Sequence, residues 1–161
     1  MKSNKKSPIT TVLMTLGLLV PVIYGFAQDK PTENMNTARE KLQADKKKYV
    51  TDNLKLDDSE AKGFWPLYES FQKELGAVND RLVKLIQDYA ANYANFTDDI
   101  AKQLVDESLA IDADRLKIRQ AYLPKFRKVL PEIKVARYYQ IESKIQAAIN
   151  YELSAGIHLA E

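Results

Sequence analysis

An apolar seam between Phe64 and Tyr89 limits what this chain can fold into more than any other feature. Apolar side chains recur there at alternating steps of four and three residues: Phe64, Tyr68, Phe71, Leu75, Val78, Leu82, Leu85 and Tyr89. This spacing puts the whole seam on one face of a long helix. Asp57 followed by Glu60 is typical of a capping box at the start of that helix.

The first turns of this predicted helix contain a proline and the only tryptophan of the chain. Pro66 removes a backbone donor and crowds the preceding turn, which predicts a bend near residues 62–64 rather than a break. We expect Trp65 to be a core or interface residue beside that bend. A role in stacking on a ligand is the alternative.

Three further helices are expected around this one. Residues 35–56 predict a first helix with a lysine face, and Thr97 caps another that begins with Asp98 and Asp99. The apolar residues of that helix spread over a broad stripe, which predicts two neighbours, and Pro124 predicts a kink. Pro131 suits the start of the last helix, and Gly156 its end. The predicted fold is all-α, with about four helices, two of them long and proline-kinked, forming a bundle or an elongated hairpin-like cradle.

The N-terminus has the layout of a secretory signal peptide. Lys2, Lys5 and Lys6 precede an uncharged apolar run that ends with Gly25 and Ala27, small residues at the positions that a signal peptidase recognises. We expect cleavage after Ala27 and a periplasmic or secreted protein without a membrane span, and an uncleaved membrane anchor is the alternative. The expected organisation is a signal peptide over residues 1–27, a disordered segment over 28–35, one helical domain over 36–155 and a tail over 156–161.

Composition excludes several classes of site. The chain has no cysteine and one histidine, so disulfides, thiolate metal sites and His-rich metal sites are ruled out. It has neither a histidine base beside a nucleophile nor a glycine-rich phosphate loop, and its paired acids are explained as helix caps. We therefore expect no enzyme, no metal and no cofactor. The expected export signal argues against nucleic acid as the partner.

Charge is unevenly distributed along the chain. Residues 57–112 carry twelve acids and five bases, whereas residues 113–144 carry nine bases and three acids. In one interpretation the acidic and basic helices lie side by side and partly neutralise each other. In the other, the basic segment is a surface reserved for a partner.

Two helix starts resemble those of a known family. The segments "LKLDDSEAKGFWPLYESFQKEL" and "KVLPEIKVARYYQIESKI" each begin with a leucine followed by acids or proline. They resemble the repeated Leu-Thr-x-x-Gln helix starts of the Spy/CpxP-type periplasmic proteins. Leu56 and Leu130 match the motif, whereas Asp57 replaces its threonine and Lys134 stands at the place of its glutamine. The chain also lacks the His-rich or Met-rich composition of the metal-sensing relatives.

The resemblance implies an ATP-independent chaperone or a protein of the envelope stress response. It also implies an association into cradle-shaped homodimers with a basic, partly apolar concave face that holds unfolded or specific envelope proteins. On this chain that face would draw on cations and on exposed apolar side chains: Arg115, Lys117, Arg119, Leu123, Lys125, Phe126, Arg127, Lys128, Lys134, Arg137 and Tyr139. The alternative function is a structural or adaptor protein whose heptad seam docks one specific envelope partner.

Overall fold

The computed structural model describes residues 31–157, and this part of the chain is all-α. Its helices are α3 (Pro31–Leu54), α4 (Asp58–Asn92), α5 (Asp98–Arg127) and α6 (Glu132–Gly156), with a short 3₁₀ helix, η1 (Tyr93–Asn95), after α4. The all-α prediction is confirmed, and no strand occurs between residues 31 and 157. These residues form two compact units. We call residues 56–135 the hairpin unit, and residues 31–55 with 136–157 the terminal unit.

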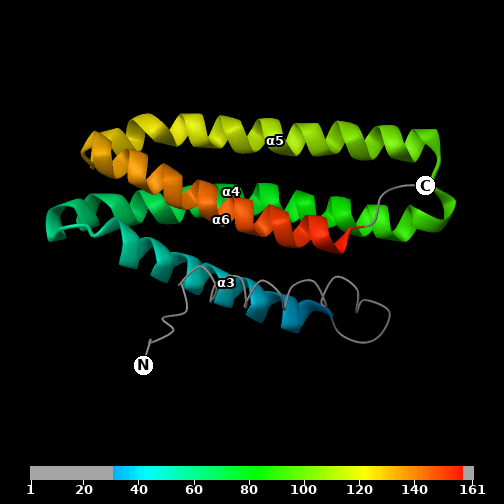
Figure 1. Ribbon diagram of the computed structural model, residues 1–161, viewed down its shortest axis with the longest axis horizontal. Helices are drawn as coiled ribbons and strands as arrows, with labels where there is room; N and C mark the ends of the chain where they lie inside the picture. Colours follow the sequence, from blue (N-terminus) through cyan, green and yellow to red (C-terminus); the bar gives the residue numbers. More distant parts are fainter. Residues whose placement is uncertain (1–30, 158–161) are drawn as a thin grey trace, which may run out of the picture. The chain divides into compact units, whose positions relative to one another are not determined.

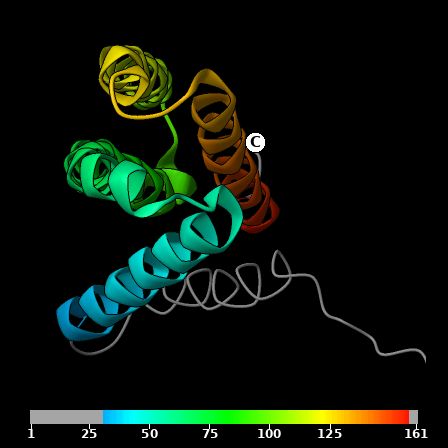
Figure 2. The same cartoon turned by 90° about the vertical axis from the view of Figure 1, so that its left-hand side faces the viewer.

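The hairpin unit is built on two long antiparallel helices, α4 with 35 residues and α5 with 30 (Figure 1). Figure 2 shows the same two helices nearly end on, one beside the other. Helix α4 begins with the predicted capping box: Asp57 accepts from the Glu60 N–H at 2.9 Å, and Glu60 accepts from the Asp57 N–H at 2.9 Å. Thr97 caps α5 as predicted, because its hydroxyl accepts from the Ile100 N–H.

Both prolines expected inside long helices lie within continuous helix. Helix α4 runs on through Pro66, and α5 runs on through Pro124. Trp65 is half-buried and makes edge contacts with Phe64 and Tyr68, at centroid distances of 5.1 and 5.3 Å. These ring contacts agree with its interpretation as a core or interface aromatic.

The heptad seam of α4 faces the core in its first half. Its first five residues, Phe64 to Val78, are buried, whereas Leu82, Leu85 and Tyr89 are half-buried and Ile86 takes their place in the core. At about 100° per residue Ile86 falls at the same angle around α4 as the buried Tyr68, whereas Leu85 falls outside the arc that the five buried residues cover. Five of the eight seam residues are thus buried, and the other three are partly exposed.

An aromatic cluster joins α4 to α5 near the end of α5. The ring of Phe126 lies 5.6 Å from those of Phe64 and Phe71, and Tyr122 lies 5.1 Å from Phe71. At the same end, Gly63 allows a close approach, since a Cβ on this residue would lie 3.0 Å from the side chain of Val129. The Pro131 carbonyl then accepts from the N–H groups of Lys134 and Val135 and so begins α6.

The terminal unit contains α3 and most of α6. Tyr49, Val50 and Leu54 are buried on α3, and Tyr138, Ile141 and Ile145 on α6. Glu142 is buried as well, and an ion pair of 2.8 Å with Lys46 compensates its charge. Lys55 follows α3 in a left-handed conformation (φ 51°), as is common just after a helix end.

Some of the predicted boundaries lie within the described part of the chain, and others lie outside it. Helix α3 begins at Pro31, so residues 31–35, which we expected to be disordered, are helical; proline is well tolerated in the first turn of a helix. The predicted signal peptide (residues 1–27) lies outside the described residues, as do 28–30 and 158–161. Helix α6 ends at Gly156 as predicted. The single domain expected over 36–155 stays a prediction.

Candidate functional site

The predicted contact residues fall in both units. Most belong to the second half of α5, to the turn after it and to the first turn of α6, all within the hairpin unit. Arg137 and Tyr139 belong to the terminal unit; Arg137 is exposed, and Tyr139 is half-buried with its ring edge-on to Tyr138 at 6.0 Å. The candidate surface described below is limited to the hairpin unit.

Three of the predicted cations are engaged within the chain. The Arg115 guanidinium donates to Asp112 at 3.0 Å and to Asn79 of α4 at 3.2 Å. Arg127 pairs with Glu132 at 2.9 Å, and Lys134 pairs with Glu60 of α4. The Lys134–Glu60 pair joins the basic and acidic segments, as the neutralisation interpretation expects.

The other predicted cations of the hairpin unit are three lysines and one arginine. Lys117 and Lys128 are exposed, and Lys125 places its ammonium 3.9 Å from the centre of the Tyr122 ring. Arg119 is half-buried. The second half of α5 therefore presents positive charge to solvent.

One predicted apolar contact is wrong. Phe126 is fully buried in the aromatic cluster, and so it is core rather than surface. Its position 15 residues after the core residue Ile111 brings it back to the face of α5 that meets α4. Leu123, the neighbouring candidate, is half-buried.

Sequence reasoning missed a second apolar face on α5. Val105, Leu109 and Leu116 are exposed to 58, 65 and 56%. At about 100° per residue they fall within an arc of about 40°, well away from the buried Ile111 and Tyr122. We call Val105, Leu109 and Leu116 the outer stripe. The breadth of the apolar pattern on α5 could have indicated this second face. The pattern predicted two neighbouring helices, and the hairpin unit supplies one of them, α4.

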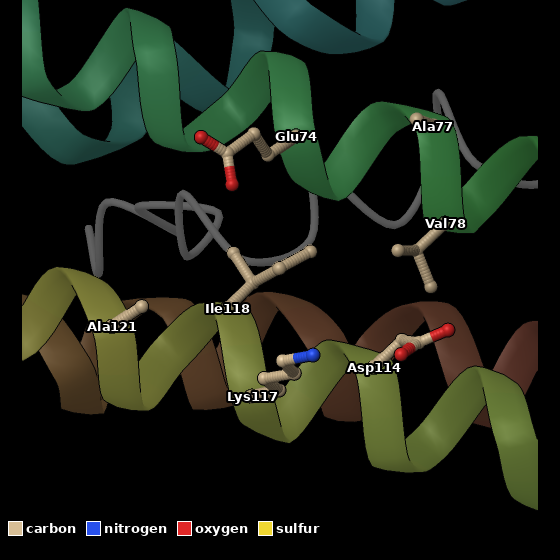
Figure 3. A pocket seen from close by; sticks show the side chains of 7 residues that line it. All are labelled: Glu74, Ala77, Val78, Asp114, Lys117, Ile118 and Ala121. Atoms are coloured by element: carbon tan, nitrogen blue, oxygen red, sulfur yellow. The ribbon is translucent and has the colours of Figure 1, made fainter.

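A groove of about 400 Å³ lies between α4 and α5 on another side of the hairpin unit. Figure 3 shows Glu74 and Val78 from α4 and Ile118 from α5 directed into the space between the helices. Glu74 accepts from the Tyr122 hydroxyl at 2.6 Å, and Asp114 accepts from Arg81 at 2.5 Å. Both carboxylates of the groove thus hold the two helices together. The remaining lining residues are Ala77, Lys117 and Ala121.

The titration shifts of the hairpin unit have structural causes. Arg81 of α4 donates to both oxygens of Glu107 at 2.9 and 3.2 Å and also to Asp114. These hydrogen bonds lower the pKa of Glu107 and raise the pKa of Arg81. Burial, followed by the hydrogen bond to Glu74, raises the pKa of Tyr122 to about 12. Between residues 31 and 157 no three His, Cys, Asp or Glu side chains are grouped in a way that could hold a metal ion.

Comparison of the chain with protein-family models, with curated proteins and with solved structures gave no match in any of the three. Within the described part of the chain, no helix combines the length and the apolar character that a membrane span requires.

Proposed function

We propose that this protein is an exported, non-enzymatic binding protein that holds unfolded polypeptides of the bacterial envelope without ATP. The outer stripe of α5 carries the proposal. Three large apolar side chains are more than half exposed on one helix face, which is the kind of surface that marks a protein-binding site.

Positive charge at the Leu116 end of the outer stripe supports a polypeptide as its ligand, whereas Val105 and Leu109 lie in the acidic half of α5. From Arg115 to Lys128 the chain has six bases and no acid. Positive charge beside apolar side chains attracts segments that carry both apolar and acidic residues, and it speeds their encounter with the surface. A helix face without a deep pocket suits many sequences at modest affinity, as holding a range of clients requires.

The test measures light scattering while a denatured client protein is diluted into buffer with or without the purified protein. We expect near-stoichiometric amounts to suppress aggregation and high salt to weaken the effect. Changing Leu109→Asp and Leu116→Asp together should abolish suppression, whereas the far-UV circular dichroism should stay helical because both side chains are exposed.

Lys102→Glu is the matched control for a cation change, because Lys102 is exposed on the same helix but pairs with Asp106 in its acidic half. Lys128→Glu should weaken suppression more than this control does. If several-fold excess of the wild-type protein leaves the scattering unchanged, the holding function is overturned, and a dedicated partner becomes the better account of the stripe.

A further inference from the structure

The buried core of the hairpin unit is concentrated at one end. We call residues 79–115 the tip half and residues 56–78 with 116–135 the base half; the two halves are of similar length. Nine apolar side chains are buried in the base half: Phe64, Tyr68, Phe71, Leu75, Val78, Tyr122, Phe126, Leu130 and Val135. Between residues 79 and 115 two are buried, Ile86 and Ile111. Because burial of apolar surface is the main stabilising term, the tip half is held together far less strongly.

Polar side chains join α4 to α5 within the tip half. Arg81 donates to Glu107 at 2.9 and 3.2 Å and to Asp114 at 2.5 Å. Arg115 donates in the other direction, from α5 to Asn79 of α4, at 3.2 Å. The side chains of Arg81, Glu107 and Asp114 are 38, 41 and 46% exposed. Ion pairs as open as these add little stability, so they compensate only in part for the small core.

The turn at the end of the tip half adds ring contacts that are only partly buried. The Tyr89 ring lies 5.7 Å from the Tyr93 ring and 5.6 Å from the Phe96 ring. Tyr93 is 41% exposed, and the other two rings are half-buried. These contacts hold the turn itself and leave the helices between the turn and the base half with the two buried isoleucines.

We propose that the tip half opens as one unit while the base half stays folded, and that acid favours the open form. Regions with few buried apolar contacts open at a lower free energy than the rest of a fold. Opening uncovers Ile86 and Ile111, and Ile111 lies in the same stretch of α5 as Val105 and Leu109 of the outer stripe. The open form thus offers a client more apolar surface. This role rests on the proposed function, whereas the opening itself does not.

Glu107 is the group through which acid acts on the tip half. It faces Arg81 and Lys84 from α4 and Asp114 from its own helix. Chiefly the hydrogen bonds from Arg81 lower the pKa of Glu107 below its ordinary value of 4.5. A lowered pKa contributes stability that is present above the unfolded-state value and is lost as pH falls through the folded-state value. The closed form therefore loses stability below pH 4.5, where the hydrogen bonds to Arg81 lose their charge.

Hydrogen–deuterium exchange of the purified full-length chain, read by mass spectrometry and corrected for the intrinsic rate at each pH, tests the opening. Amides of the tip half should share one level of protection, at least about 10-fold below that of the best-protected base-half amides. Glu107→Gln with Asp114→Asn keeps both side-chain shapes and removes both charges. At pH 7 this variant should lower protection in the tip half by about 5-fold and leave the base half unchanged.

Asp88→Asn with Asp106→Asn is the matched control. It removes the same number of charges from the tip half, but Asp88 and Asp106 pair with Lys84 and Lys102 of their own helices and do not join α4 to α5. Protection in the tip half should fall by no more than about 2-fold.

The pH profile separates an acid response from a merely structural role of these carboxylates. Below pH 4.5 the wild type and the control should lose protection in the tip half relative to the base half. The Glu107→Gln, Asp114→Asn variant should show no such step. Equal protection in both halves, or an acid step that persists in this variant, would overturn the proposal.

Client scattering at pH 7 tests the role of the opening without exposing the client to acid. The Glu107→Gln, Asp114→Asn variant should suppress aggregation at a lower concentration than the wild type does. Equal suppression by an open variant and the wild type keeps the holding function and overturns the role of the opening. If the tip half opens as described but neither protein suppresses aggregation, the holding function is lost and the opening stands.

Discussion

The carboxylate of Asp57 shows how single side chains set the helix starts of this protein. Two reciprocal hydrogen bonds with Glu60 satisfy backbone N–H groups that a helix start would otherwise leave without a partner. Tyr122 acts at the same scale within the core: its ring is buried while its hydroxyl reaches the exposed Glu74. Each of these contacts couples stability to pH.

The Asp57 cap should make stability depend on pH in the acid range. Chiefly the hydrogen bond from the Glu60 N–H lowers the pKa of Asp57 below its ordinary value of 3.8. A lowered pKa contributes stability that is present above the unfolded-state value and is lost as pH falls through the folded-state value. Asp57→Asn caps equally well but does not titrate. Urea midpoints of both proteins should differ near neutral pH and converge below about pH 3; a constant difference would contradict the prediction.

The Tyr122 hydroxyl should make stability depend on pH in the alkaline range, where stability should fall as pH rises. Its pKa of about 12, against an ordinary 10.0, means that the folded state favours the neutral phenol. The resulting stability is present below pH 10 and is lost as pH rises from about 10 to 12. The Tyr122→Phe variant should not show this loss of unfolding free energy between pH 10 and 12. At pH 7 it should cost about 1 kcal/mol of unfolding free energy, for the hydrogen bond to Glu74. Urea unfolding at pH 7 and 11 tests both statements.

At the scale of helices, α4 and α5 are held together by apolar contacts at one end and by charged contacts along their length. Phe64, Phe71 and Phe126 form the aromatic end. Arg81 binds Glu107 and Asp114 farther along. A Cβ on Gly63 would lie only 3.0 Å from the Val129 side chain, so α4 and the turn after α5 are closely packed at this point.

The two glycines of α4 should respond differently to alanine. Gly76 has open space where a Cβ would lie, so Gly76→Ala should raise the unfolding free energy by about 0.5–1 kcal/mol through helix propensity. A Cβ on Gly63 would lie 3.0 Å from Val129, so Gly63→Ala should lose that gain or become destabilising. Chemical unfolding of each variant measures the difference.

A double-mutant comparison isolates the contact with Val129. In a Val129→Ala background the obstacle to a Cβ on Gly63 is smaller, so Gly63→Ala should then be clearly more favourable than in the wild type. If Gly63→Ala stabilises the wild type as much as Gly76→Ala does, the close approach does not limit this position.

At the scale of the whole molecule, the chain divides into the hairpin unit and the terminal unit. The hairpin unit contains both predicted caps, the aromatic cluster, the Arg81 ion pairs and the outer stripe. Its chain is continuous, from Leu56 to Val135, whereas the terminal unit is made of two segments far apart in sequence. The hairpin unit is therefore the natural candidate for independent folding.

We expect residues 56–135, expressed alone, to be helical and to unfold cooperatively in urea. Its apolar seam and caps are internal, and antiparallel helices joined by a short connection fold without long-range closure. Phe126→Ala in this fragment should cost about 3–5 kcal/mol and so leave it largely unfolded. An unstructured wild-type fragment, by circular dichroism, would show that the hairpin unit needs the rest of the chain.

Much of the fold could be predicted, and less of the candidate site. The capping box at Asp57, the Thr97 cap and the helix end at Gly156 follow from side chains within a few residues of the backbone groups that they affect. The site depends on burial: Phe126 was wrongly placed at the surface, and the broad apolar stripe of its helix, to which Leu109 and Leu116 belong, predicted two neighbouring helices without indicating which residues would stay exposed. Their residue types are alike; only the position of α4 separates them.

The sequence by itself determined the helical class of this protein and the starts of α4 and α5, because periodicity and capping act between neighbours in the chain. Tertiary structure alone decided which apolar face of α5 is buried, which cations are engaged and where the outer stripe lies. Lys134 is engaged because Glu60 reaches it from another helix, and Leu116 is exposed because no helix of the hairpin unit covers it. Both outcomes depend on contacts between residues that are far apart in the sequence. The local pattern of residues does not determine which of these contacts will form.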